Sequence, residues 1–272
     1  MARSQSRAES AIQRITSLHS SSRGHLHFLP LDLSDLTTIK PAVERFLARE
    51  SRLDWLNHNA AISMPDPKTK SPQGHDLSYA TNVLGPYLLT KLLLPTLNET
   101  ARKLPDEGKG MVRVSWAGSA VIEALSQSGG LAFDSTGTPK DYWWNIYTGT
   151  KTANLFLCRE FARRTDAVLH NCYNPGNLKS NLLHNLRAQV GEWMLRPLDW
   201  FVLYPGVMGA YTELWAGLSP ELGMGDQGCY IVPWGRKVGE GHLRNDLVQN
   251  IGEGRGSEKL WDWCERETGR FT

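Results

Sequence analysis

The chain has 272 residues, of which 40% are hydrophobic and 21% are charged, and this composition fits one globular domain over residues 1–272. A formal net charge of +2, with scattered basic residues, argues against nucleic acid as a partner. No apolar run reaches the roughly 18 residues of a membrane-spanning helix, so we expect no transmembrane segment. The four cysteines form no C-x-x-C pair, so neither a metal site nor a disulfide framework is indicated.

The N-terminal segment "MARSQSRAESAIQRITSLHSSSRG" is rich in arginine and serine and poor in acidic residues. It contains no apolar signal-peptide core, and Ala8, Ala11, Ile12, Ile15 and Leu18 fall on one face of a predicted helix. A mitochondrial presequence is one interpretation of this pattern. A resemblance described below explains the same residues without one, so we expect a cytoplasmic protein.

Strand-like and helix-like runs alternate along the rest of the chain. We expect strands at 25–35, 53–61, 111–119, 167–176 and 229–235. We expect helices up to about residue 50, over 76–97, over 147–164 and in the closing stretch "SEKLWDWCERE", with a loop at 120–145 and a helical region after residue 176. This alternation predicts an α/β fold with a doubly wound parallel sheet.

The stretch "NIYTGTKTAN" carries Tyr147 four positions before Lys151, so both side chains share one helical face. Free tyrosine has a pKa near 10, and a nearby ammonium group lowers that pKa. The pair is therefore suited to exchange a proton with a substrate oxygen. Taken alone, the spacing is more often structural, with a partly buried tyrosine and a solvated lysine at a helix N-terminus.

Three other features favour the chemical interpretation. Ser119 ends the strand "VSWAGSA", at the edge of a parallel sheet where such folds bind ligands, and its hydroxyl is suited to hydrogen-bond a carbonyl oxygen. Asn82 lies in an otherwise apolar helix, where a buried amide needs partners and a water-bridged link to a lysine would supply one. Pro175-Gly176 follows the fourth strand and lets the backbone approach a ligand closely.

The order of these residues resembles a short-chain dehydrogenase/reductase of the type common in fungal metabolism, over nearly the whole chain. The resemblance implies hydride transfer between NADP(H) and a carbonyl or alcohol. It makes Tyr147 the proton donor, with Lys151 lowering the tyrosine pKa and holding the ribose. Ser119 would orient the carbonyl group, and Asn82 would hold the water that feeds protons through Lys151.

The same resemblance implies cofactor contacts outside this group of four. In "LPLDLSDL", Asp32 resembles the aspartate that contacts the adenine ring. Asn59 in "HNAA" stands where the family has N-N-A-G and would lie along the cofactor. "NPGNLKS" resembles the segment near the nicotinamide, which assigns Leu178 and Ser180 to that end.

The family's first strand, Gly-rich turn and helix hold the pyrophosphate, and no such segment precedes Asp32. The start "MARSQSRAESAIQRI" resembles the end of the family's second strand and the following helix, which places Arg3 beside the 2′-phosphate of NADP. We therefore expect a Rossmann-like domain that is N-terminally truncated, with its first two strands missing. The strand at 25–35 then either pairs directly with the strand at 53–61 or leaves an unpaired edge.

If the segment that holds the pyrophosphate is missing, there are two alternatives to an active enzyme. The chain would be a truncated, catalytically inactive relative that acts as a binding or scaffold protein, or the sequence would be an incomplete gene model. A literal G-x-G-x-x-G at Gly223, Gly225 and Gly228 does not replace the missing turn, because it precedes the last strand and opens no helix. We interpret it as a surface turn.

The substrate is expected to be a hydrophobic small molecule of secondary metabolism. Trp193, Trp200, Phe201 and Tyr204 cluster in the region 183–225, which resembles a substrate lid, followed by the C-terminal strand and helix at 226–272. Alternatively, these rings pack the C-terminal helices or an interface. The helices 76–97 and 147–163 resemble those of the family's dimer interface, so a homodimer or tetramer is expected.

Overall fold

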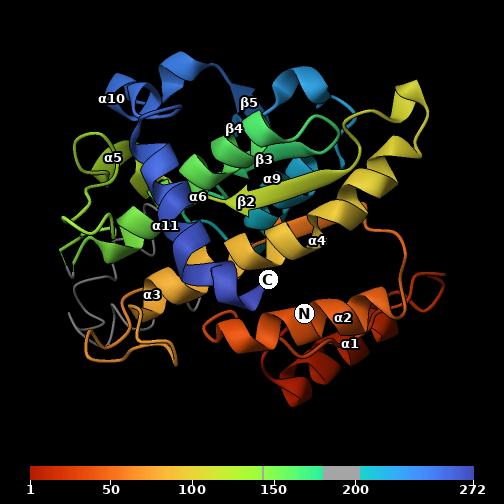
Figure 1. Cartoon of the computed structure of the whole chain (residues 1–272). Helices are drawn as coiled ribbons and strands as arrows, with labels where there is room; N and C mark the ends of the chain where they lie inside the picture. Colours follow the sequence, from red (N-terminus) through yellow and green to blue (C-terminus); the bar gives the residue numbers. More distant parts are fainter. Residues whose placement is uncertain (143, 180–202) are drawn as a thin grey trace.

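The computed structural model describes residues 1–142, 144–179 and 203–272, and at its centre lies a five-stranded sheet in the order β1-β2-β3-β4-β5 (Figure 1). Its strands are β1 (Trp55–His58), β2 (Arg113–Ala117), β3 (Leu169–Tyr173), β4 (Cys229–Val232) and β5 (Arg236–Val238). Strands β1 to β4 pair in parallel, whereas β5 pairs antiparallel to β4. The predicted parallel sheet is confirmed, but the last predicted strand is in fact a hairpin.

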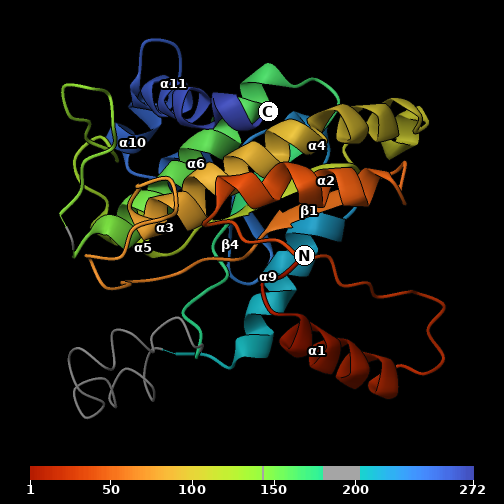
Figure 2. The ribbon, with the colours of Figure 1, turned by 60° about the horizontal axis from the view of Figure 1, so that its bottom comes forward.

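Helices cover both faces of this sheet (Figures 1 and 2). On one face, α4 (Gly85–Arg102) and α6 (Ile146–Arg164) contribute to the larger hydrophobic cluster, and on the other α9 (Gly206–Leu218) packs over β2, β3 and β4. Every residue of β2 and β3 is buried, as expected for parallel strands that have helices on both sides. The doubly wound arrangement is therefore confirmed.

The remaining helices agree with the predicted pattern in most places. They are α1 (Gln5–Leu18), α2 (Ile39–Leu47), α3 (Leu77–Tyr79), α5 (Val121–Leu125), α10 (Asn245–Gln249) and α11 (Gly256–Thr268). The helix predicted over 76–97 is interrupted by a π-helical turn at Ala80–Leu84, a distortion often found at functional sites. Part of the region 183–225, with its predicted lid, lies outside the described residues, so the lid stays a prediction.

The strand predicted over 25–35 is not formed. Its only ladder contact in the described residues is a parallel bridge between Ala2 and Pro30, with hydrogen bonds of 3.1 Å from Ala2 N to Leu29 O and from Leu31 N to Ala2 O. Of the two alternatives, direct pairing with β1 does not occur, because β1 pairs with β2 alone in the described part of the chain and lies at the edge of the sheet. The apolar run specified an extended segment but did not specify its partner.

Helix α1 begins directly after this bridge, as the expected succession of strand end and helix requires. The Ser4 side chain caps it by accepting a hydrogen bond from Arg7 N. Helix α1 has no buried residue and lies at the margin of the molecule, apart from the layer that α2 and α4 form (Figure 2).

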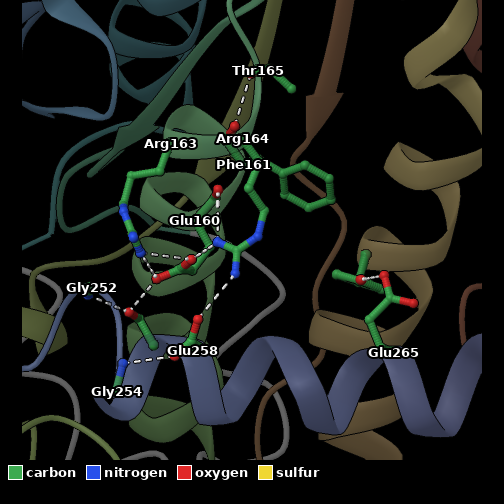
Figure 3. Close-up of polar contacts among 11 residues, drawn as sticks. Glu160, Phe161, Arg163, Arg164, Thr165, Gly252, Gly254, Glu258 and Glu265 are labelled. Atoms are coloured by element: carbon green, nitrogen blue, oxygen red, sulfur yellow. Dashed lines mark hydrogen bonds and ion pairs between the residues drawn. The ribbon is translucent and has the colours of Figure 1, made fainter.

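The C-terminal helix α11 docks on α6 through a buried carboxylate. Glu160 of α6 has no exposed surface, and its charge is paired with Arg163 at 3.1 Å and with Arg164 (Figure 3). Ser257 at the start of α11 donates a hydrogen bond of 2.5 Å to Glu160, and Glu258 lies 3.7 Å from Arg164. A buried charge left unpaired is costly, so these contacts tie the two helices together.

Aromatic rings complete the docking of α11. The Trp261 ring lies edge-on to Tyr87 of α4 and Phe161 of α6, at centroid distances of 5.1 and 4.8 Å, and the Arg164 guanidinium lies 4.3 Å from the Trp261 ring. Part of the surface of the two helices predicted to form a dimer interface is thus covered by α11 of the same chain. A homodimer or tetramer stays a prediction.

No helix in the described ranges combines the length and apolarity that crossing a membrane requires. Within the same ranges, no three side chains of His, Cys, Asp or Glu are grouped in a way that would hold a metal ion.

Two histidines are buried in the layer between the sheet and α4 and α6. His58 Nε2 lies 2.6 Å from Thr90 Oγ1, and the His170 ring stacks on Phe161 at a centroid distance of 5.3 Å. Burial lowers the pKa of both imidazoles to about 3, with the neighbouring His58 adding to the effect at His170. Both rings are therefore neutral in the folded protein at any physiological pH.

We predict that these histidines make the fold sensitive to acid. Between about pH 6.5 and pH 3 the unfolded chain binds a proton at each imidazole, whereas the folded chain does not. As the pH is lowered through this range, the free energy of unfolding should therefore fall by about 1.4 kcal/mol per pH unit for each histidine. Urea unfolding at about pH 5.5 and pH 4.5, where the imidazoles are charged in the unfolded chain and neutral in the folded chain, measures the slope. The variant His170→Phe, which keeps a stacking ring, should reduce it by about 1.4 kcal/mol per pH unit; an unchanged slope would contradict the assignment.

Candidate active site

The candidate residues gather at the carboxyl edge of the sheet. Asn59 follows β1, Ser119 follows β2 and Pro175-Gly176 follows β3. Because these strands are parallel and adjacent, their carboxyl ends open on the same side, where ligands bind in such folds. Asn59 is exposed there.

Tyr147 and Ser119 meet at this edge. Tyr147 lies in the first turn of α6, behind Asn145 at the N-cap, and the nearby Ser119 side chain affects the ionisation of its hydroxyl group. Burial raises the pKa of Tyr147 to about 12, although the interaction with Ser119 acts in the opposite direction. The phenol is therefore protonated at neutral pH.

Lys151 lies one helical turn further along α6 and is only 3% exposed. Its ammonium Nζ donates a hydrogen bond of 2.8 Å to Ala117 O at the end of β2 and lies 5.8 Å from the centroid of the Tyr147 ring. Burial lowers the pKa of Lys151 to about 8. The expected lowering of the tyrosine pKa by this lysine is not observed, because burial dominates the ionisation of both groups.

Asn82 lies in the π-helical turn and is 1% exposed. Its amide pairs with the backbone of Ile62 in both directions, at 2.9 Å each, and donates to Thr150 Oγ1 at 3.1 Å. Thr150 in turn donates to Tyr147 O at 2.8 Å. The partners observed for the buried amide are thus protein groups, which connect Asn82 to α6; its water-mediated link to Lys151 stays a prediction.

Asp32 and Arg3, which were predicted to contact the adenine and the 2′-phosphate of a cofactor, lie in two different segments. Asp32 Oδ1 accepts hydrogen bonds from Ser34 N at 2.9 Å and Ser34 Oγ at 2.6 Å, so its carboxylate stabilises its own turn. Arg3 is exposed between the Ala2 bridge and the Ser4 cap of α1. Their proposed contacts with adenine and the 2′-phosphate stay predictions.

Leu178 pairs with Tyr204 in an isolated parallel bridge and lies against Gly209 of α9. Ser180, with Trp193, Trp200 and Phe201 of the predicted lid, lies outside the described residues. Tyr204 is half-exposed, and its ring meets the Trp234 ring edge-on at 5.0 Å.

Gly176 is explained by packing as well as by its backbone. Its φ of 94° lies in the region that favours glycine, and a Cβ here would come within 2.8 Å of the Trp234 ring. A close approach at Gly176 is made by Trp234, from the turn between β4 and β5, and the predicted approach of a ligand stays a prediction. Gly223, Gly225 and Gly228 lie in the turns before β4, as predicted.

A polar cluster that the sequence patterns did not indicate lies behind Ser119. Tyr230 of β4 donates to Ser119 O at 3.3 Å and to Glu123 Oε1 at 2.9 Å, and His242 Nε2 lies 3.1 Å from Glu123 Oε2. Asn174 donates to the same carboxylate at 3.4 Å and accepts from Gly176 N at 2.9 Å. No local motif marks this cluster, because its members come from separate segments.

A pocket of about 150 Å³ opens beside Tyr147. Its walls are mostly apolar, with one carboxylate and two hydroxyl-bearing side chains. The lining residues are Met64, Pro65, Pro67, Asp76, Ser78, Ile146 and Tyr147.

Comparisons with known proteins identify the family. The sequence model of the short chain dehydrogenases matches residues 1–113. A short-chain dehydrogenase/reductase of Phomopsis amygdali is 39% identical, over 98% of this chain and 80% of the relative. The short-chain dehydrogenase/reductase iacJ of Pestalotiopsis fici is 38% identical, over 97% of this chain and 79% of the relative.

A solved structure supports the fold independently. The NADPH-bound carbonyl reductase from chicken fatty liver superposes with a TM-score of 0.61 at 20% sequence identity, covering 88% of this chain and 81% of that protein. At this identity the superposition supports the fold alone, whereas the fungal relatives support the family. The chain belongs to the short-chain dehydrogenase/reductase family, in the group represented by these fungal proteins.

Proposed function

We propose that the chain is an NADP(H)-dependent oxidoreductase that acts on a carbonyl or alcohol group of a hydrophobic small molecule, in fungal secondary metabolism. The observation that carries this proposal is the contact of Ser119 with Tyr147 at the carboxyl edge of the sheet, one turn from the buried Lys151. Family membership and the NADPH-bound carbonyl reductase among the similar structures add support. The apolar pocket beside Tyr147 suits a hydrophobic substrate.

The residues present fit the nicotinamide end of the cofactor better than its pyrophosphate. Lys151 and Tyr147 would hold the nicotinamide ribose, Asn59 and Leu178 would flank the cofactor, and Arg3 with the free N–H groups at the start of α1 suits a phosphate. The described residues contain no Gly-rich turn between a strand and a helix to hold the pyrophosphate. A bound nicotinamide supplies or accepts the hydride.

The chain's own residues would handle the proton. A tyrosine with a pKa near 12 keeps its proton at neutral pH, so Tyr147 is suited to donate it to the alkoxide formed when a carbonyl is reduced. Ser119 would donate a hydrogen bond to the same oxygen, and the Lys151 ammonium stabilises negative charge left on the phenol oxygen.

A catalytically inactive binding protein is the second candidate. The observation that favours it is the absence, within the described ranges, of a turn that would hold the pyrophosphate. The two candidates differ in whether the folded chain binds NADPH.

The first prediction concerns turnover. The folded chain should bind NADPH and reduce a bulky apolar ketone, and Tyr147→Phe should lower kcat by at least about 100-fold, since it removes the proton donor. NADPH affinity, measured by fluorescence, should change less than about threefold because most cofactor contacts remain. A folded chain without NADPH binding would favour the inactive relative; full turnover by Tyr147→Phe would disprove the role of Tyr147.

The second prediction concerns cofactor choice. Arg3→Ala should weaken NADPH binding by about 10- to 100-fold, the loss of one charge-assisted contact to the 2′-phosphate, and should leave NADH binding unchanged. Arg14→Ala, a charge change within α1 (Gln5–Leu18), the helix that follows Arg3, is the matched control. Equal loss for NADPH and NADH, or no loss at all, would contradict the role of Arg3.

The third prediction links chemistry to stability. Below about pH 8 the folded protein carries a buried ammonium whose pKa has fallen from 10.5, so Lys151→Met should raise the free energy of unfolding at pH 7 by about 1–3 kcal/mol. The same variant should lose activity. Lys103→Met, at an exposed surface lysine, should change stability by less than about 0.5 kcal/mol. A Lys151→Met variant that is less stable than the wild type would contradict the destabilisation assigned to the buried ammonium group.

A further inference from the structure

Asp141 lies in the loop that leads into α6, shortly before Tyr147, and its carboxylate is held on two sides. The Tyr79 hydroxyl of α3 donates a short hydrogen bond to Oδ2, and Gln127 Nε2 donates to Oδ1 at 2.9 Å. The carboxylate thus joins three segments that are distant in sequence. None of these three residues, Tyr79, Gln127 and Asp141, is among those assigned to the reaction.

The helix α6 makes room for this carboxylate. A Cβ at Gly149 would lie 2.0 Å from Asp141 Oδ2 and 2.8 Å from the Tyr79 hydroxyl oxygen, so no larger residue fits there without moving both groups. Gly149 has ordinary helical geometry and is not among the residues with positive φ. Space, and not backbone conformation, therefore explains a glycine in the first turns of this helix.

These contacts connect the two walls of the pocket beside Tyr147. Tyr79 belongs to α3, and Asp76 and Ser78 at the start of that helix line one side of the pocket. Ile146 and Tyr147 at the start of α6 line the other side. Tyr79 of α3 contacts Asp141, and both side chains lie against Gly149 of α6. A shift of α3 would therefore be transmitted to α6 through this contact.

We propose that Asp141 is a positioning residue: through Tyr79 and the close approach at Gly149 it fixes the start of α6, and with it the Tyr147 hydroxyl, relative to the substrate pocket. This inference rests on the proposed function of Tyr147 as proton donor. Asp141 touches no reacting atom, and its effect is expected to pass through the geometry of Tyr147. A misplacement of about 1 Å at a reacting group can cost about 100-fold in rate.

The electrostatic environment is consistent with a rigid, enclosed contact. Burial raises the pKa of Asp141 to about 6; the hydrogen bond from Tyr79 opposes this effect and the charge of Asp76 adds to it. Burial also raises the pKa of Tyr79 well above its ordinary value, with Asp141, Asp76 and Cys264 of α11 contributing. The phenol therefore remains the donor and the carboxyl group the acceptor.

The test compares three variants with a matched control. Asp141→Ala removes the acceptor, Gly149→Ala fills the space, and Asp141→Asn keeps an acceptor of the same shape without the charge. Asp134→Ala is the control, since this exposed carboxylate of the same loop accepts hydrogen bonds from Thr136 and Thr138 of its own turn. Hydrogen exchange of the amides of residues 149–153, the first in α6 with helical hydrogen bonds, is measured on the chain without cofactor; the separate values of kcat and KM are the other readouts.

We expect Asp141→Ala and Gly149→Ala to raise hydrogen exchange at the start of α6 by at least about 10-fold and to lower kcat by about 10- to 100-fold with little change in KM. Asp141→Asn and Asp134→Ala should stay within about threefold of the wild type in both measurements. Rescue by the asparagine variant separates positioning from a charge effect.

Several outcomes would overturn the proposal. Unchanged exchange in Asp141→Ala means that the contact does not hold the helix, and an equal loss of kcat in Asp141→Asn means that charge carries the effect. If Gly149→Ala fails to fold, the two Asp141 variants still decide. If the wild-type chain shows no turnover, the proposed function fails, while the exchange experiment still tests whether Asp141 holds α6.

Discussion

The buried ammonium group of Lys151 constrains the rest of the site. One carbonyl oxygen, Ala117 O at the end of β2, accepts hydrogen bonds from Lys151 Nζ at 2.8 Å and from Asn154 Nδ2 at 3.2 Å. This double contact fixes the start of α6 against the end of β2. Ser119 and Tyr147, which lie close in sequence to the two anchored points, are brought together as a result. A charge with so little access to water requires such a fixed acceptor.

Burial also determines which chemistry the site is suited for. It raises the pKa of Tyr147 and lowers that of Lys151, so each group is driven towards its neutral form. The neutral form of a phenol holds a proton, and the neutral form of an amine has lost one. In the proposed reaction the pair would therefore work in a limited pH range, in which the phenol can donate a proton while the amine is still charged. Sequence spacing alone suggested a lower tyrosine pKa, because spacing does not report the depth of burial.

Local patterns predicted most of the fold and the centre of the site. Alternating strand and helix signals placed β1 to β4, and the four-residue spacing of Tyr147 and Lys151 on α6 is a property of the helix itself. The strand predicted over 25–35 failed because an apolar run becomes a strand only beside a partner, and Pro30 offers Ala2 a single bridge. The hairpin of β4 and β5 was missed because its turn follows directly on an apolar strand.

The supporting contacts could not have been predicted in the same way. Asp141 meets Tyr79 and Gln127, and Glu123 meets Tyr230 and His242, across stretches of sequence that carry no common pattern. Gly149 within "YTGTK" reads as an ordinary helical glycine until the carboxylate beside it is seen. Gly176 is similar, since the Trp234 ring that requires it lies in another part of the chain. Contacts of this kind depend on tertiary structure and are not encoded by spacing.

The docking of α11 has a consequence for synthesis on the ribosome. The Tyr87 and Phe161 rings and the Glu160 carboxylate are made early, but the helix that covers them, Gly256–Thr268, is made much later. Until α11 emerges, the nascent chain presents an aromatic surface with a charged group at its centre. The helical layer therefore cannot be completed before α11 has been made, and its aromatic rings stay exposed until then.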